Sequence, residues 1–158
     1  MKKLTHFDKE GKARMVDVGG KEITLREAVA WGCIKMNRET FRRIQDKKIK
    51  KGDPLGVAQV AGIMAAKRTG ELIPMCHPLS LTNVELSFEP REKDCSIGIR
   101  SKVKATERTG VEMEALTAVA VAALTIYDMC KSSDRGMVIS EIKLLEKKGG
   151  KSGKFIRT

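Results

Sequence analysis

Histidine and paired cysteines are scarce in this sequence. Two histidines are present, His6 and His77, and no C-x-x-C pair occurs among the four cysteines, which are Cys33, Cys76, Cys95 and Cys130. Zinc ribbons, histidine-rich metal sites and disulfide frameworks need such groups at characteristic spacings. We therefore expect no metal site, and we expect the thiols to be reduced, as in the cytoplasm.

Aromatic residues are also few, at 4% of the chain. The net charge of +11 indicates an anionic partner, and nucleic acid, a membrane surface or a phosphorylated small molecule would each fit. Proteins that bind single strands stack bases on exposed aromatic side chains, but Phe88 alone lies in a clearly predicted strand. The scarcity of aromatics weakens the nucleic-acid interpretation without removing it.

Long apolar runs are missing as well. The longest uncharged stretch, from Ala115 to Tyr127, is shorter than the roughly 20 apolar residues that cross a bilayer. Residues 1–20 are polar and charged, unlike a signal peptide. We expect a cytoplasmic protein without membrane contact. It would have a flexible N-terminus (1–12) and a single catalytic domain (13–158) that ends in a flexible basic tail.

Turn and cap residues divide this domain into segments. The sequence over 15–24 predicts a strand that enters a Gly-Gly turn. Asn37 caps a short charged helix over 37–52. Asp53, followed by proline, begins a second helix that ends at Gly70 as a left-handed C-cap. This second helix is rich in Gly and Ala, so another backbone can approach it closely.

Alternating apolar and polar residues predict three further strands, over 81–90, 95–105 and 136–148, with a turn at 91–94. Residues 24–36 are ambiguous. Thr24 and Glu27 form a capping-box pattern typical of a helix, whereas the alternation from Ala28 to Met36 favours a strand. The strand interpretation uses every element in a split βαβ arrangement. It predicts an α+β fold, with an antiparallel sheet and helices packed on one face.

The stretch from Thr109 to Lys131 predicts one long helix with charges only at its ends. Thr109 and Glu112 fit a capping box, and the helix dipole favours an acid such as Glu114 in a first turn. Asp128 breaks the local rule, because a negative charge near a helix C-terminus is unfavourable and Lys131 compensates it only partly. Residues that break a local rule indicate function.

Glu114 and Asp128 lie roughly 21 Å apart along such a helix and on nearly the same face. One small ligand could hardly contact both within one subunit, so either the ligand is long or a neighbouring chain completes the site. The small residues Ala118, Ala122 and Thr125 favour the second alternative. We expect the helix to be covered by its own sheet on one side and by a partner subunit on another.

Three further positions could carry chemistry. His77 lies between Pro74 and Pro78, which restrict the loop backbone. It is either a packed loop histidine or a group that binds a ligand or transfers a proton. Lys51 precedes a Gly-Asp-Pro helix start and Lys147 precedes a Gly-Gly turn, where ammonium groups and backbone amides can converge on phosphate.

Three blocks of the sequence closely resemble the cyclic pyranopterin monophosphate synthase family of molybdenum cofactor biosynthesis, also called accessory protein C. They are KGDPLGVAQVAGIMAAKRTGELIPMCHPL, TGVEMEALTAVAVAALTIYDMCK and LLEKKGGKSG, and the similarity extends from about Met15 onward. The resemblance implies a ferredoxin-like α+β subunit, a homohexamer built as a trimer of dimers, and an active site at a subunit interface. It also implies a lyase that converts (8S)-3',8-cyclo-7,8-dihydroguanosine 5'-triphosphate to cyclic pyranopterin monophosphate with release of pyrophosphate.

The same resemblance implies roles for individual residues. Catalysis would fall to Asp128 and Lys131, with Lys51 assisting. The substrate would be bound by Met75, Cys76, His77, Met113, Glu114, Glu112 and Lys147. No cofactor would be required, although Mg²⁺ can accompany the triphosphate.

Two other functions fit the same composition. A ferredoxin-like module could bind RNA through its basic face, with steeply salt-dependent affinity and no need for Asp128. An interaction scaffold would use the apolar helix for assembly and would tolerate changes at Asp128, Lys131 and His77. Release of pyrophosphate from the cyclised guanosine triphosphate separates the three functions.

Overall fold

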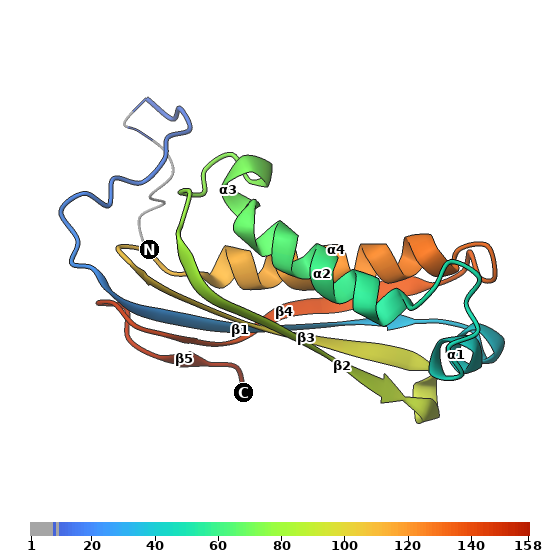
Figure 1. The fold of residues 1–158 in the computed structure, drawn as a ribbon. Helices are drawn as coiled ribbons and strands as arrows, with labels where there is room; N and C mark the ends of the chain where they lie inside the picture. The colour runs from blue at the N-terminus through green and yellow to red at the C-terminus, as the bar shows by residue number, and fades with distance from the viewer. Residues whose placement is uncertain (1–7, 9) are drawn as a thin grey trace.

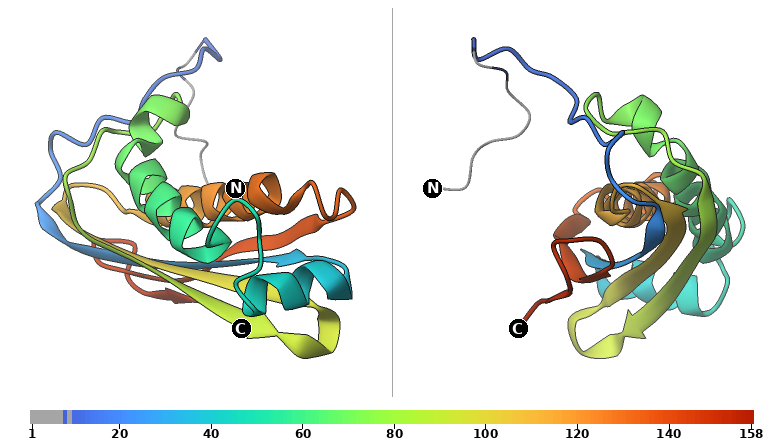
Figure 2. Two further views of the ribbon diagram at one scale, coloured as in Figure 1. Left: turned by 45° about the vertical axis from the view of Figure 1, so that its right-hand side comes forward. Right: turned by 90° about the vertical axis from the view of Figure 1, so that its left-hand side faces the viewer.

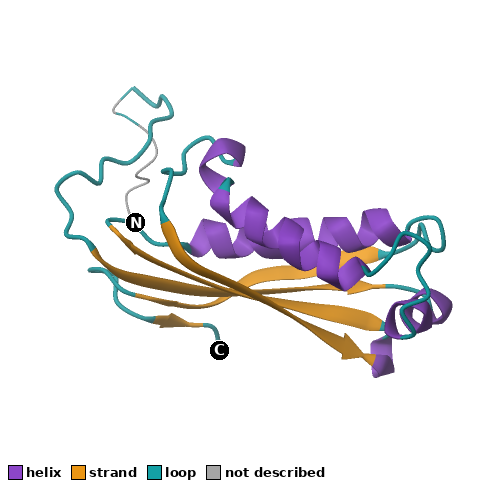
Figure 3. Ribbon diagram, in the orientation of Figure 1, coloured by secondary structure: helices purple, strands orange, loops and turns teal. Residues whose placement is uncertain are grey.

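The computed structural model describes residue 8 and residues 10–158, and it shows one antiparallel sheet covered by helices on one face (Figure 1, Figure 3). The strand order is β2-β3-β1-β4-β5. The elements are β1 (Thr24–Lys35), α1 (Arg38–Gln45), α2 (Pro54–Lys67), α3 (Thr69–Leu72), β2 (Leu81–Arg91), η1 (Glu92–Asp94), β3 (Ser96–Glu107), α4 (Glu112–Cys130), β4 (Val138–Lys148) and β5 (Phe155–Ile156). The expected α+β, ferredoxin-like architecture is confirmed, and Figure 2 shows α2 and α4 on the same side of the sheet.

Strand β1 is the centre of the sheet. It pairs along its whole length with β3, beginning with Thr24 opposite Glu107, and on its other side with β4. The β4 ladder shifts register near Glu141, whose φ of 56° lies in the left-handed region, as at a β-bulge. The strand interpretation of residues 24–36 is therefore confirmed, and the helical alternative is wrong.

The core lies between this sheet and α4. Its largest fully buried side chains include Ile34, Ile97, Ile99, Val103, Val119 and Ile126. Gly32 on β1 lets the helix come close, because a Cβ there would lie 2.7 Å from Val119 Cγ1. By length and composition alone α4 could cross a membrane, but 56% of its apolar window is buried inside the subunit, as in a core helix.

Helix α2 packs directly on α4, as its small residues predicted. A Cβ on Gly62 would lie 2.9 Å from the carbonyl oxygen of Ala118, so the two helix backbones are in close contact there. Asp53 caps α2 as predicted, and its Oδ1 accepts a hydrogen bond from Leu55 N at 3.0 Å. The opposite face of α2 exposes three apolar side chains at helical spacing, Val57, Val60 and Met64, by 48%, 58% and 46%.

The chain before β1 differs from the prediction. Residues 14–23 are irregular, so the strand predicted over 15–24 is wrong. Asp17 provides a physical reason, because its Oδ1 accepts a hydrogen bond from Gly19 N at 2.8 Å and so favours a turn. The turn at the Gly-Gly pair is present, closed by Lys21 N donating to Val18 O at 3.0 Å. The N-terminus predicted to be flexible, 1–12, lies largely outside the described residues.

Two helices end earlier than predicted. Helix α1, capped as expected by Asn37, ends at Gln45 rather than near residue 52, because Lys47 adopts a left-handed φ of 55°. Helix α2 ends at Lys67, and Gly70 lies within α3 instead of forming a left-handed cap. The glycine is needed there for a different reason, since a Cβ would lie 3.1 Å from the backbone of Pro78.

The basic tail contains an element that was not predicted. Phe155 and Ile156 form β5, a short strand that pairs antiparallel with Lys147 and Glu146 of β4. The pairing folds the end of the chain back along the edge of the sheet and holds the loop between β4 and β5 beside the start of α4 (Figure 1).

Candidate functional site

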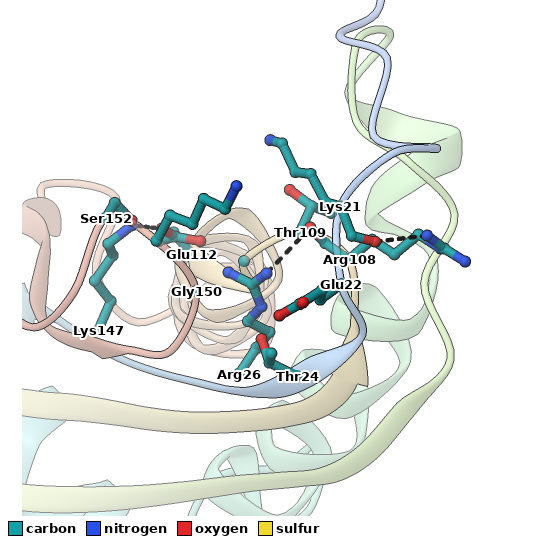
Figure 4. A pocket seen from close by; sticks show the side chains of 12 residues that line it. Lys21, Glu22, Thr24, Arg26, Arg108, Thr109, Glu112, Lys147, Gly150 and Ser152 are labelled. Carbon is teal, nitrogen blue, oxygen red and sulfur yellow. Dashed lines mark hydrogen bonds and ion pairs between the residues drawn. The ribbon is translucent and has the colours of Figure 1, made fainter.

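A cavity of about 600 Å³ opens where the starts of β1 and α4 meet the end of β4 (Figure 4). Five cationic and two acidic side chains line it, namely Lys21, Arg26, Arg108, Lys147 and Lys151 with Glu22 and Glu112. Its volume is in the range of small-molecule sites. The excess of positive charge makes the cavity suitable for a polyphosphate or a nucleotide.

Arg26 is the most enclosed cation in this cavity. Its residue is 8% exposed, and its guanidinium donates to the main-chain carbonyls of Glu107 and Arg108 at 3.2 and 3.1 Å. Within the described part of the chain no carboxylate forms an ion pair with it. A buried guanidinium held by neutral groups keeps its charge uncompensated, which favours an anionic ligand.

The loop after β4 passes directly over Arg26. Gly149 and Gly150 adopt φ values of 97° and 71°, in the region that favours glycine. A Cβ on Gly150 would lie 1.8 Å from Arg26 Nη1. Glycine at this position therefore allows the loop and the guanidinium to share one wall of the cavity.

Lys147 reaches the cavity from β4. Its Nζ pairs with Glu112 Oε1 at 2.9 Å and donates to Ser152 Oγ at 2.8 Å. Glu112 is the first residue of α4, and Val111 occupies the N-cap position without a side-chain hydrogen bond. The predicted capping box between Thr109 and Glu112 is wrong, because the glutamate extends to Lys147 instead of back to the cap.

A second cavity, of about 390 Å³, adjoins the first, and Lys21, Thr109, Gly110 and Glu112 line both. Its lining also includes Met75, Cys76, His77, Met113 and Glu114. The structure therefore gathers at one end of α4 all of the side chains predicted to bind substrate. They come from the loop before β2, the first turn of α4 and the end of β4.

Glu114 is almost completely buried, with 3% of its surface exposed. Burial raises the pKa of its carboxyl to about 7; a backbone hydrogen bond offsets this in part, and the charge of Glu112 adds to the rise. Near neutral pH the group is thus divided between acid and carboxylate, and it can donate or accept a proton. Burial, together with the charge of Glu114, also raises the pKa of Cys76, which keeps this side chain a thiol.

His77 contacts the irregular chain before β1. Its Nε2 lies 2.8 Å from the carbonyl oxygen of Val16, so Nε2 carries a proton and donates. The ring also lines the second cavity beside Cys76. Both interpretations of the histidine find support, since it holds a neighbouring segment and lies on a cavity wall.

The predicted catalytic residues lie at the other end of α4. Asp128 Oδ1 pairs with Lys131 Nζ at 2.7 Å, and Asp128 Oδ2 lies 3.6 Å from Lys51 Nζ. Lys51 Nζ also donates to the main-chain oxygen of Asp128 at 3.1 Å. The structure thus brings the three predicted catalytic residues together, with the C-terminus of α4 between two ammonium groups.

This cluster is open to solvent in a single subunit, where the Asp128 and Lys131 side chains are 59% and 53% exposed. The hydrogen bond from Lys131, followed by its charge and that of Lys51, lowers the pKa of Asp128. The same hydrogen bond raises the pKa of Lys131. Both directions favour the charged forms, so in this environment the pair is an ion pair rather than a proton relay.

A smaller basic cavity, of about 190 Å³, lies beside the catalytic cluster. It is lined by Lys51, Met129, Ser132 and Ser133, by Arg43 of α1, and by side chains of the segment after α1 that include Lys48 and Lys50. Arg43 and Lys48 already pair with Glu39 and Asp46. Lys51 and Lys131 share the single carboxylate of Asp128, so the surroundings of Lys51 carry a net positive charge.

The site residues form two clusters at opposite ends of one helix. At 1.5 Å per residue, Glu114 and Asp128 are separated by roughly 21 Å along α4. The substrate-binding and catalytic residues therefore do not meet within one subunit. Among the residues that the structure describes, no group of three or more His, Cys, Asp or Glu side chains is placed to hold a metal ion.

Comparison with known proteins identifies the family. The model of the MoaC family matches residues 15–150. A cyclic pyranopterin monophosphate synthase of Heliobacterium modesticaldum is 64% identical over 157 residues, which cover 99% of each chain. Enzymes of the same name from a Thermoanaerobacter species and from Desulfitobacterium hafniense are each 62% identical over 154 residues, covering 98% of this chain and 98% and 94% of theirs. The chain belongs to the MoaC family.

Four cations that line the larger cavity of this MoaC-family chain were not among the predicted site residues. They are Arg26, Arg108, Lys21 and Lys151. A signal existed for Arg26, because it alternates with Ala28 and Ala30 on the buried face of β1, where a charge is costly. No comparable signal marks Lys21, Arg108 or Lys151, because they lie in the irregular segments next to β1, β3 and β4 and meet in one cavity only through the tertiary fold.

Proposed function

We propose that this MoaC-family chain is a lyase of molybdenum cofactor biosynthesis that converts (8S)-3',8-cyclo-7,8-dihydroguanosine 5'-triphosphate to cyclic pyranopterin monophosphate and pyrophosphate. The observation that carries the proposal is the pair of adjoining cavities at the start of α4. One is rich in cations around buried Arg26, and the other holds the buried acid Glu114. The relatives named as cyclic pyranopterin monophosphate synthases support the same reaction.

The two cavities suit different parts of the substrate, the larger one the triphosphate and the smaller one the base. Arg26 and Lys147 offer charge and donors to the triphosphate. Glu114 can accept hydrogen bonds from the guanidine-like edge of the base, or donate one when it is protonated. Met75 and Met113 add apolar surface to the wall of the second cavity, which suits the flat ring.

Pyrophosphate release follows from closure of the cyclic phosphate. A hydroxyl oxygen of the sugar-derived chain bonds to the α-phosphorus, the bond from that phosphorus to the bridging oxygen breaks, and pyrophosphate leaves with its added negative charge. Cations stabilise this charge as it develops. The hydroxyl proton and the protons of the ring rearrangement need an acid–base pair, the role assigned to Asp128 and Lys131 with help from Lys51.

The distance between the two clusters supports a site shared by two chains. In a homohexamer built as a trimer of dimers, the end of α4 in one subunit would lie over the cavities of another. Enclosure would disfavour the charged forms of Asp128 and Lys131, and it would bring their pKa values closer together. The apolar face of α2, with Val57, Val60 and Met64, is a suitable surface for such an assembly.

The remaining expectations follow from this function. A cytoplasmic enzyme without bound nucleic acid or membrane fits a small-molecule substrate. The chain needs no cofactor of its own for the steps assigned to its residues. Mg²⁺ would enter with the triphosphate, as part of the substrate, and would be held by phosphate oxygens.

The test is release of pyrophosphate by the purified protein from the cyclised guanosine triphosphate. Asp128→Asn and Lys131→Ala should each lower turnover by at least about 100-fold, because general acid–base groups contribute that much. Lys143→Ala is the control, since Lys143 forms a similar exposed pair with Glu141 at 2.8 Å and should change turnover by less than about twofold. Full turnover in folded Asp128→Asn and Lys131→Ala variants would refute the catalytic assignment, as an RNA-binding module or a scaffold would predict.

A further inference from the structure

Residues 16–22, here called the strap, run along both cavities just before β1. Val16, Val18 and Lys21 line the smaller of the two, and Lys21 and Glu22 line the larger. Figure 1 shows this segment in blue beside the chain that leads into β2, and Figure 4 shows Lys21 on the same cavity as Arg26. The strap is therefore a wall of the candidate site that has no regular secondary structure.

The strap is held to the rest of the subunit by main-chain carbonyls. His77 Nε2 donates to Val16 O at 2.8 Å. Arg108 Nη1 donates to Gly19 O at 2.7 Å and to Lys21 O at 2.5 Å. Val16 and Val18 are half-buried, while the other strap residues are exposed. Segments with few buried contacts open at low cost in free energy.

Arg108 connects the strap to the buried cation of the cavity. Its main-chain oxygen accepts a hydrogen bond from Arg26 Nη2 at 3.1 Å, while its guanidinium donates to the strap. A ligand that contacts Arg26 therefore acts on a residue that is itself bonded to the strap. Arg108 is a positioning residue in this arrangement.

We propose that the strap is a lid that closes over bound polyphosphate and that Lys21 is the cation that it delivers. In the closed arrangement the Lys21 ammonium shares a cavity with Arg26, Lys147 and Lys151. The cations of this cavity outnumber its two acids, so without an anion their repulsion weakens the closed arrangement. A bound polyphosphate attracts the Lys21 ammonium into the cavity. Binding of the anion and closure of the strap therefore favour each other.

Closure would also protect the chemistry. The inference rests on the proposed function for the identity of the anion, a nucleoside triphosphate whose α-phosphorus must react with an internal hydroxyl rather than with water. A strap that excludes water from the cavity favours the internal reaction over hydrolysis. Lys21 would contribute to substrate binding more than to the chemical step, because it would contact the phosphates both before and after the cyclic phosphate forms.

Hydrogen exchange of the strap amides, measured by mass spectrometry on the full-length protein with and without inorganic tripolyphosphate, tests the lid. We expect tripolyphosphate to slow exchange of residues 16–22 at least about tenfold, and Lys21→Ala to lose about tenfold in tripolyphosphate affinity. Lys12→Ala changes an exposed lysine that lies before the strap and lines neither cavity, and this variant should behave as wild type. Arg108→Gln should abolish the protection, and Arg108→Lys should restore part of it.

Kinetics with the cyclised guanosine triphosphate separate the lid from the proposed function. Lys21→Ala should raise KM about tenfold with little change in kcat. If wild-type protein turns over no substrate but tripolyphosphate still protects the strap, the proposed function fails and the lid remains. If strap exchange is the same with and without saturating tripolyphosphate, or if Lys21→Ala and Lys12→Ala bind it equally well, the lid proposal is wrong.

Discussion

Glu114 is a buried carboxyl in the first turn of α4, on the wall of the second cavity. Its environment contains the acid Glu112 and the thiol of Cys76, and the causes that raise its pKa outweigh the hydrogen bond that lowers it. Folding therefore favours the protonated form of this side chain. A carboxyl whose pKa is higher in the folded than in the unfolded chain lowers the free energy of unfolding at high pH and does not change it at low pH.

The sign and the window of this effect give a prediction. Below the usual value of 4.5 the carboxyl is protonated in both folded and unfolded chains, and above about 7 it is charged in both. Stability should thus fall as pH rises between these values, by up to about 3 kcal/mol at about 1.4 kcal/mol per pKa unit. We expect Glu114→Gln to match wild type in thermal unfolding at pH 4 and to be more stable at pH 8.

When Glu114→Gln is compared with wild type, the contributions of all other titrating groups to the pH dependence of stability cancel. Glu85→Gln, at an exposed position of β2, is the control for the substitution itself and should change stability by less than about 0.5 kcal/mol. Equal stability of Glu114→Gln and wild type at pH 8 would mean that Glu114 is not held in an environment that disfavours its charge.

Individual residues could be predicted where they break a local rule. Asp128 is conspicuous in the sequence because an acid at a helix C-terminus is unfavourable, and in the structure it contacts Lys131 and Lys51. Glu112 was assigned to a capping box because sequence spacing cannot show that Lys147, far along the chain, lies within 2.9 Å. Cavity cations such as Arg108 are likewise defined by the meeting of distant segments.

At the scale of elements, the contact between α2 and α4 determines how the helix layer is built. Gly62 lies against the backbone of Ala118, and Leu86 Cδ2 would be 2.6 Å from an added Cβ. Both neighbours belong to the packed core, so neither can move away without opening a gap elsewhere. The contact positions α4, and through it both clusters of site residues.

Gly62→Val should therefore lower stability by about 1–3 kcal/mol, the cost of overpacking a core. Urea unfolding at fixed protein concentration measures this change. The control is Gln59→Val on the exposed face of the same helix, which should cost well under about 1 kcal/mol. Similar stabilities for the two variants would show that the helices can separate at little cost.

The elements themselves were largely predictable because their signals are local. Asn37 and Asp53 cap their helices as expected, and alternation identified β1, β2, β3 and β4. The errors have physical causes of two kinds. The strand predicted over 15–24 is replaced by a turn through an Asp17 hydrogen bond, and β5 forms because the tail finds a free edge on β4.

At the scale of the whole molecule, the two clusters at opposite ends of α4 predict complementation between inactive subunits. Lys147→Ala damages one end and Asp128→Asn the other. If each site combines the two ends from different chains, a mixed pair of subunits contains one doubly damaged site and one intact site. Random mixing should then restore about a quarter of wild-type turnover, because half of the pairs are mixed and each has one good site of two.

Pyrophosphate release by co-expressed, differently tagged variants measures this recovery. Lys147→Ala combined with Glu114→Gln is the matched control, since both changes affect the same end and no intact site can form. Absence of recovery in mixed pairs of Lys147→Ala and Asp128→Asn would place the whole site within one chain, and the shared-site proposal would then be wrong.

The length of α4 also has a consequence for the enzyme in dilute solution. If the site is shared between chains, a lone subunit carries two incomplete halves and no complete site, so specific activity should decrease once the protein is diluted below the dissociation constant of the assembly. A nucleotide that contacts both halves would then act as a link between chains and drive reassembly by mass action.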